Sequence, residues 1–241
     1  MTRALLALHA ATRFRLTPAR RIVCENDPEG SQGPLLFMSG CEEGWIGYVR
    51  EDVDDAAARA FDELILREPP VRAPGAVPRF ADAYREIVGW SDLLTGHNYG
   101  PIHRLPRGLR WTGEAALVRS GTPEGEVLRT RIEREGMPQG MIEAGFADLS
   151  HFWEPWCVAL AEGELAAIAF AARKGLLAAD VGVFTIQAHR GRGLAAAVTA
   201  AWSTLLPRHP VLFYSTHRDN AASQRVIAKL ALPFVGESFC L

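Results

Sequence analysis

Residues 179–232 read ADVGVFTIQAHRGRGLAAAVTAAWSTLLPRHPVLFYSTHRDNAASQRVIAKLAL and carry the strongest structural signals of the chain. Its first part, Val181–Ile186, is β-branched and aromatic and predicts a strand. The alanine- and leucine-rich run that ends at Pro207 predicts a helix. Between them lies a turn that reads Arg190-Gly191-Arg192-Gly193-Leu194-Ala195. The stretch therefore predicts a strand, a glycine-bearing turn and a helix, in that order.

This turn has the properties of a phosphate site. Glycines allow the backbone to approach a ligand closely. The first turn of a helix offers unpaired N–H groups and the positive end of the helix dipole, which together attract anions. Arg190 and Arg192 add charge that can reach phosphate oxygens. We therefore expect the turn to bind a phosphate group.

Three other kinds of turn have similar sequences. One is a surface turn with incidental arginines. Another is a dinucleotide site, because Gly191-x-Gly193-x-x-Ala196 fits the loose fingerprint and Asp219 follows the next predicted strand. That fold needs several strands after its first βαβ unit, and only the 22 residues from 220 to 241 follow Asp219. A P-loop is excluded because no Gly-Lys-Ser/Thr follows the turn.

The sequence also resembles a known family. Arg190-x-x-Gly193-x-Ala195 resembles the Q/R-x-x-G-x-G/A signature of the GNAT superfamily of N-acyltransferases, which bind acetyl-CoA. The segment Asp219–Leu230 is similar to the superfamily's second helix, N-x-x-S/A-x-x-V/L-x-x-K-L/N-G-F. Val211–Thr216 predicts the strand between the two helices. The order strand, turn, helix, strand, helix, final strand is that of the superfamily's C-terminal half.

The resemblance implies where acetyl-CoA binds. Its pantetheine arm is expected in a gap between Val181–Ile186 and Val211–Thr216, with main-chain contacts to the first of these strands. The turn is expected to hold the pyrophosphate. The implied cofactor-binding residues are Phe184, Thr185, Ile186, Arg190, Gly191, Arg192, Gly193, Leu194, Ala195, Asn220 and Ser223. Two of them have a structural alternative, since Asn220 is a favoured N-cap and Ser223 an ordinary first-turn residue.

Amine acylation needs a base for the amine proton and an acid for the leaving thiolate. Many GNAT enzymes have the acid as a tyrosine seven residues after the helix asparagine, where this chain has Ile227. Tyr214, on the strand beside the gap, is the candidate for the acid in place of that tyrosine. The alternative is that Tyr214 only packs against its neighbours. Some GNAT histone acetyltransferases use a glutamate near the start of the central strand as the base, and Asp180 holds roughly that place in this sequence. Its apolar neighbours predict a raised pKa for Asp180. The alternatives are a solvated Asp180 and His217 as the base.

Composition limits the classes of protein. The chain has 241 residues, 48% of them hydrophobic and 22% charged, as in globular proteins, and its net charge of −2 disfavours nucleic-acid binding. Four scattered cysteines without C-x-x-C spacing predict reduced thiols, no zinc site and a cytoplasmic protein. Met1–Ala11 is too short to span a membrane and predicts an amphipathic helix, and no metal cluster is apparent.

Two units are predicted along the chain. Residues 1–110 form a smaller α/β unit with a hairpin at 34–49, a helix at 56–66 capped by Asp52 or Asp54, and a proline-rich linker at 69–78. The glycine-, proline- and histidine-rich segment 96–108 marks the boundary. Residues 111–241 form the acetyltransferase domain, an α/β fold whose mixed, mostly antiparallel sheet carries helices on both faces.

The favoured function is transfer of acetyl from acetyl-CoA to a primary amine by direct attack in a ternary complex. The alternative is a non-catalytic acyl-CoA-binding protein with a degenerate site, which Ile227 favours. A dinucleotide oxidoreductase is the third class. The acceptor is left open between a small molecule and a protein amine, and the assembly is left open with a homodimer as one option.

Overall fold

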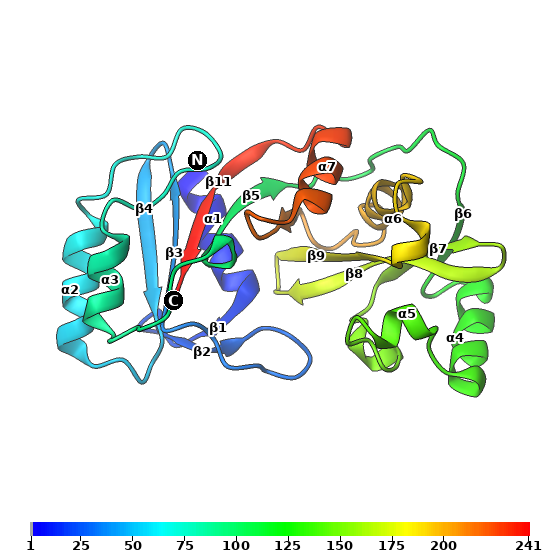
Figure 1. Ribbon diagram of the computed structural model, residues 1–241, viewed down its shortest axis with the longest axis horizontal. Coiled ribbons are helices and arrows are strands. Elements are labelled where there is room, and N and C mark those ends of the chain that lie inside the picture. Colours follow the sequence, from blue (N-terminus) through cyan, green and yellow to red (C-terminus); the bar gives the residue numbers. More distant parts are fainter. Residues whose placement is uncertain (1) are drawn as a thin grey trace.

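A twisted nine-stranded sheet runs through the computed structural model, which describes residues 2–241 (Figure 1). The strand order is β4-β3-β11-β5-β10-β9-β8-β7-β6. Only β9 and β10 run parallel, and every other neighbouring pair is antiparallel. A separate two-stranded sheet joins β1 and β2. The predicted mixed, mostly antiparallel sheet is confirmed.

The elements have the following bounds. The strands are β1 (Phe14–Leu16), β2 (Ile22–Glu25), β3 (Leu36–Cys41), β4 (Gly44–Val49), β5 (Tyr99–Arg104), β6 (Ala116–Arg119), β7 (Trp156–Ala161), β8 (Glu164–Lys174), β9 (Ala178–Thr185), β10 (Val211–Ser215) and β11 (Phe234–Cys240). The α-helices are α1 (Thr2–Arg13), α2 (Asp55–Ile65), α3 (Ala81–Ile87), α4 (Pro123–Glu135), α5 (Gln139–Ile142), α6 (Leu194–Trp202) and α7 (Ala221–Lys229). Short 3₁₀ turns are η1 (Gly96–Asn98), η2 (Leu149–His151) and η3 (Gln187–His189).

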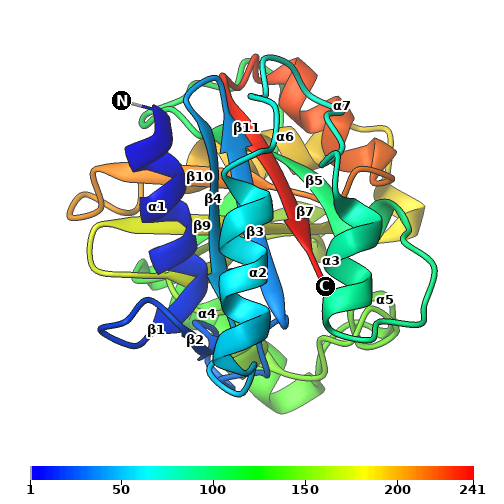
Figure 2. The ribbon, with the colours of Figure 1, turned by 90° about the vertical axis from the view of Figure 1, so that its left-hand side faces the viewer.

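Helices cover both faces of the sheet, and successive side chains of a strand pack against the helices of opposite faces. Side chains alternate along a strand. Along β9, Ala178 belongs to the core beneath α1, whereas Ala179 and Val181 belong to the core beneath α6 and α7. Strands β3 and β4 lie between α1 on one side and α2 and α3 on the other (Figure 1 and Figure 2). The faces of α1 and α6 are therefore opposite faces of the sheet.

Local sequence signals explain several element boundaries. Asp54, not Asp52, caps α2, accepting hydrogen bonds from the backbone N–H groups of Ala56 and Ala57 at 2.9 Å each. Asp52 instead pairs with Arg50. The predicted amphipathic helix near the N-terminus is confirmed over the described residues as α1.

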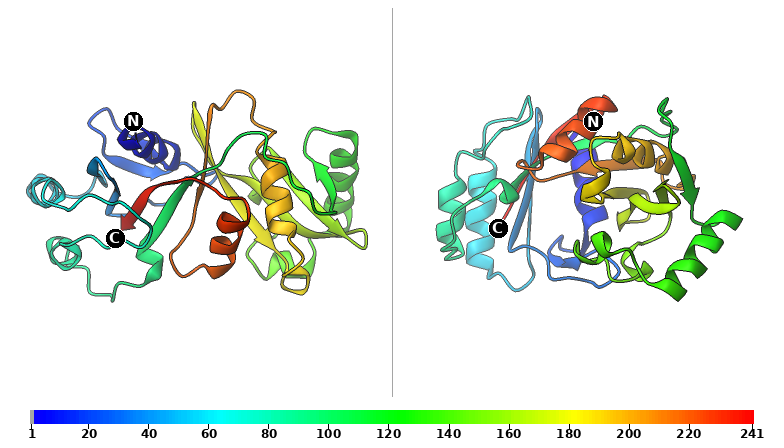
Figure 3. Two further views of the ribbon diagram at one scale, coloured as in Figure 1. Left: turned by 90° about the horizontal axis from the view of Figure 1, so that it is seen from above. Right: turned by 45° about the vertical axis from the view of Figure 1, so that its right-hand side comes forward.

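The segment 96–108 contains a central strand, which the composition did not predict. Strand β5 lies between β10 and β11 (Figure 3). Its Gly100 permits the close approach of the neighbouring backbone, because a Cβ there would lie 1.9 Å from the carbonyl oxygen of Thr216. Residues before and after position 110 thus share one sheet. The division into units 1–110 and 111–241 stays a prediction.

Two further findings concern helices and cysteines. Helix α5 is only four residues long: it ends at Ile142, and Gly145 beyond it adopts a φ of 90°, which is outside helical geometry. None of the helices within residues 2–241 combines the length and apolar character needed to cross a membrane. All four cysteines are free thiols, with Cys41 and Cys157 buried.

Candidate functional site

The site begins where two parallel strands separate. β9 and β10 pair only over Ala178–Asp180 and Val211–Phe213. Beyond Asp180, β9 continues to Thr185 with β8 as its partner, while β10 pairs with β5 on its other side. One edge of residues 181–185 therefore has no strand partner, and its backbone groups are available to a ligand. The gap implied by the resemblance is present between these strands.

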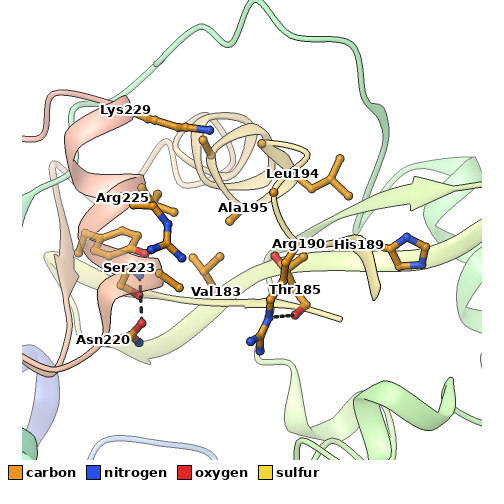
Figure 4. Close-up of a pocket in the computed structure, with 16 residues that line it drawn as sticks. Val183, Thr185, His189, Arg190, Leu194, Ala195, Asn220, Ser223, Arg225 and Lys229 are labelled. Atoms are coloured by element: carbon orange, nitrogen blue, oxygen red, sulfur yellow. Dashed lines mark hydrogen bonds between the residues drawn. The ribbon is translucent and has the colours of Figure 1, made fainter. Parts of the chain in front are cut away.

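A cavity of about 280 Å³ opens at this gap, between β9, the start of α6 and one face of α7 (Figure 4). We call it the first cavity. Three cationic side chains line it, Arg190, Arg225 and Lys229, and the described lining residues include no Asp or Glu. Figure 4 shows Arg225 and Lys229 projecting from α7 on the side of the cavity opposite Arg190. The cavity is therefore suited to an anionic ligand.

The turn before α6 aims a helix N-terminus at the first cavity. Gly191 and Gly193 have φ values of 83° and 81°, a left-handed conformation that favours glycine. The N–H of Ala197 makes a hydrogen bond of 3.1 Å to the carbonyl of Gly193. The N–H groups of the preceding first-turn residues have no intrahelical acceptor, and Ala195 among them lines the cavity. Backbone donors and cations thus surround the same space.

Most of the residues predicted for the cofactor come together here. Those that line the first cavity are Thr185, Arg190, Gly191, Gly193, Leu194, Ala195, Asn220 and Ser223. Arg192 lies outside the lining, with its guanidinium 3.2 Å from Nδ1 of His189. The Oδ1 atom of Asn220 accepts a 3.0 Å hydrogen bond from the N–H of Ser223, so the predicted N-cap is confirmed. Its contact with a cofactor stays a prediction.

The side chains of Phe184 and Ile186 point to the other face of the sheet. The Phe184 ring centroid lies 5.5 Å from that of Phe146, and Ile186 packs with the same core. Only their main chains can reach the gap. Arg225 and Lys229 were missed as site residues, although their spacing of four on a helix that begins just after Asn220 puts them on one face with each other.

Tyr214 stands where the first cavity meets a second one. Its side chain is buried and lines both. Burial raises the pKa of Tyr214 to about 12; the negative charge of Asp180 also raises it, whereas a side-chain hydrogen bond with Ser223 lowers it. The phenol therefore keeps its proton at neutral pH. Tyr214 has the position and protonation state that a proton donor needs.

The second cavity has a volume of about 560 Å³. It shares Val183, Tyr214, Asn220 and Ser223 with the first cavity. Its remaining walls come from the end of α1, from β1 to β3, from η1 and from the ends of β8 to β11, and include Arg13, Phe14, Glu25, Phe37, His97, Arg173, Asp180, Ser215 and His217. The second cavity thus reaches the gap from the α1 side of the sheet, whereas α6 and α7 enclose the first.

Asp180 is buried, with 4% of its surface exposed, and its carboxylate is fully engaged. It accepts hydrogen bonds from the Ser215 N–H at 3.2 Å and the Ser215 hydroxyl at 2.5 Å, and Nε2 of His9 lies 3.3 Å away. Burial raises the pKa of Asp180, but the hydrogen bonds with His9 and Ser215 and the charge of Arg13 outweigh it and lower the pKa overall. The predicted raised pKa is wrong, and so is the solvated alternative.

His217, the alternative base, lies exposed on the wall of the second cavity. Its Nδ1 is 2.9 Å from the carbonyl oxygen of His97, so Nδ1 carries the proton in the neutral ring and Nε2 is left as an acceptor. Although the residue is exposed, partial desolvation at the cavity wall lowers the pKa of His217, as do the charges of His97 and Arg13, against the raising effect of the His97 carbonyl and Asp219. The lowered pKa favours the neutral form of His217 at pH 7.

No protein-family model matches the chain, and no curated protein matches its sequence. Among solved structures, it is similar to a GNAT-family acetyltransferase from Novosphingobium aromaticivorans, with 18% identity and a TM-score of 0.41, over 60% of this chain and 65% of that one. It is also similar to a GCN5-related N-acetyltransferase from Kribbella flavida, with 14% identity and a TM-score of 0.44, over 67% and 62%. A GNAT-family acetyltransferase from Colwellia psychrerythraea has 17% identity and a TM-score of 0.40, over 81% and 76%. The first two coverages leave more than a third of those proteins unmatched, and these scores alone support no conclusion on activity.

Proposed function

We propose that this protein transfers the acetyl group of acetyl-CoA to a primary amine by direct attack in a ternary complex. The observation that carries the proposal is the first cavity. It joins an unpaired strand edge to a helix N-terminus and three cations, with no carboxylate among its described lining residues. Acetyl-CoA has matching parts: amide groups along its pantetheine arm and negative charge on its phosphates.

Each part of the cofactor then has a partner. The first-turn N–H groups of α6 hold the pyrophosphate. Arg190, Arg225 and Lys229 add charge-assisted hydrogen bonds to phosphate oxygens. The pantetheine amides pair with the open edge of β9 near Thr185, whose hydroxyl is buried without a hydrogen-bond partner in the described chain. The thioester is thereby directed toward the junction at Tyr214.

The two proton movements are assigned to two residues at and beyond this junction. Tyr214 gives its proton to the leaving thiolate, since its raised pKa keeps the phenol protonated until then. Neutral His217 takes the proton of the amine through Nε2. Asp180 keeps a role as the carboxylate that orients the Ser215 hydroxyl, because its lowered pKa makes it a weak base.

Calorimetry and a turnover assay test this function and separate it from its alternatives. We expect acetyl-CoA to bind and NADH not to bind, because the open edge of β9 offers partners to pantetheine amides, which NADH lacks. Release of free CoA with a library of amines, followed with a thiol reagent, distinguishes catalysis from binding alone. Binding without release for any amine would favour the non-catalytic alternative, and a preference for NADH would favour the oxidoreductase.

The pH dependence of turnover distinguishes His217 from Asp180 as the base. A base must be deprotonated to act, so the rate should rise with pH and level off once His217 is neutral. The ordinary imidazole pKa is 6.5 and that of His217 is lower, so the midpoint of this rise should lie below pH 6.5. His217→Asn should remove the rise and lower the turnover number about 100-fold or more.

His151→Asn is the matched control, because His151 lies outside both cavities. Its profile should follow the wild type. A wild-type rate that stays flat from about pH 5 to pH 7 would instead agree with the Asp180 carboxylate, whose pKa lies below 3.8. In that case the assignment of His217 is wrong.

A further inference from the structure

We propose that the amine acceptor carries a carboxylate beside its amino group, as an α-amino acid does, and that Arg13 binds this carboxylate in the second cavity. The inference rests on the proposed function, because it assigns the acceptor to the cavity that meets the acetyl-CoA site at Tyr214. It goes further by naming the acceptor's chemical class and the residue that selects it.

Arg13 is a cavity cation without a carboxylate partner within residues 2–241. A guanidinium has five N–H donors. Of these, one from Nη1 reaches the Ser215 hydroxyl at 3.4 Å, and Nε is buried with no hydrogen-bond partner in the described chain. The other arginine of this cavity, Arg173, contacts the carboxylates of Glu25 and Asp27. Arg13 therefore has unfilled donors of the kind that bind a carboxylate in pairs.

The surroundings of Arg13 hold its side chain in place. Its guanidinium carbon lies 5.7 Å from the ring centroid of Phe14 and 5.9 Å from that of Phe37. Its carbonyl oxygen accepts a 2.6 Å hydrogen bond from the N–H of Asn26, which fixes the end of α1. Aromatic faces attract a guanidinium and exclude water from it. A carboxylate that enters this space meets a positioned and partly desolvated cation, which strengthens the attraction.

The charges around Ser215 match the two ends of an amino acid. The Ser215 hydroxyl oxygen lies 3.4 Å from Nη1 of Arg13 and 2.5 Å from Oδ2 of Asp180, so a cation and an anion flank one side chain. An α-amino acid carries its ammonium and carboxylate on the same carbon. Its carboxylate can face Arg13 while its ammonium lies on the side of Ser215, where the negative charge of the buried Asp180 attracts it, before His217 on the same wall removes the proton.

Acceptors that carry only amines fit this wall less well. A polyamine or an aminoglycoside has no carboxylate for Arg13 and would bring further positive charge beside it. Glu25 does not compensate for Arg13, because its carboxylate already binds Arg173. The cavity wall therefore favours a zwitterion over a polycation.

Calorimetry with amino acids tests the proposal. The protein is saturated with CoA and titrated with each of the standard amino acids, then with the α-amide of the one that binds best. We expect the amide to bind about 10- to 100-fold more weakly than the acid, since it loses a charge-assisted pair of hydrogen bonds. Arg13→Gln should lose the same factor for the acid and almost nothing for the amide.

Arg15→Gln is the matched control, because Arg15 is exposed and outside both cavities, and it should bind the acid as the wild type does. Arg13→Lys keeps the charge and should retain part of the affinity, which decides the matter if Arg13→Gln fails to fold. Equal binding of acid and amide, equal affinities of the wild type and both Arg13 variants, or no amino-acid binding at all would overturn the proposal. Failure of acetyl-CoA to bind would overturn the proposed function instead, and the titration repeated without CoA would still test Arg13.

Discussion

Ala195→Asp is expected to weaken acetyl-CoA binding by about 100-fold while leaving the fold intact. Ala195 is the second residue of α6, half-buried, and lines the first cavity among Arg190, Arg225 and Lys229. A carboxylate there would repel the phosphates and take up the free N–H groups that should bind them. The same negative charge is favourable for the helix itself, by about 0.3–1 kcal/mol, because it faces the positive end of the dipole.

This change tests the cofactor site better than a bulky residue at Gly193. A Cβ at Gly193 would lie 3.0 Å from the Trp111 ring, and the φ of 81° strains any side chain, so a loss of binding there would be confounded with a local distortion. Calorimetry with acetyl-CoA gives the affinity of Ala195→Asp, and a thermal melt gives its stability. Both measurements are made on the same preparation.

Ala56→Asp provides the control. Ala56 is also the second residue of its helix, α2, but it is exposed and far from either cavity lining. The charge change and the helix position are the same, but Ala56 lies outside both cavity linings. We expect wild-type affinity for Ala56→Asp. A folded Ala195→Asp variant that binds acetyl-CoA as tightly as the wild type would refute the placement of the phosphates at α6.

Tyr214→Phe is expected to lower the turnover number by about 10²–10⁴-fold and to leave the affinity for acetyl-CoA unchanged. The hydroxyl lies at the junction of the two cavities, and it stays protonated because burial raises its pKa to about 12. Phenylalanine keeps the ring that packs with the core of α6 and α7 and removes only the donor. Single-turnover kinetics with saturating acetyl-CoA isolates the chemical step.

Tyr48→Phe is the comparison for this variant, because Tyr48 is also buried and its hydroxyl accepts a 2.7 Å hydrogen bond from Arg20, outside both cavities. It should keep the wild-type turnover number. If Tyr214→Phe also turns over at the wild-type rate, Tyr214 has only a packing role, and the acid must be sought elsewhere along the gap.

Several features of the candidate site depend only on neighbours along the chain and can be predicted from the amino-acid sequence. The glycines at 191 and 193 allow the left-handed turn, the run after them forms α6, and Asn220 caps α7, each as predicted from a window of a few residues. These features follow from backbone sterics and local hydrogen bonds, which the residue types in the window specify. The turn and the helix starts that form the proposed phosphate site can therefore be predicted from short windows of sequence.

The second cavity, by contrast, is built from residues that are far apart in the sequence. Strand β5 enters the sheet between β10 and β11 from a segment whose glycine and proline predict a loop, because pairing with distant strands outweighs local preference. His9 meets Asp180 across 171 residues of sequence and, with Ser215, lowers a pKa that the apolar neighbours alone would raise. Arg13 reaches the same wall from the end of α1. Contacts of this range leave no periodicity or spacing in the sequence, so the charged groups that line the second cavity come together only when the chain folds.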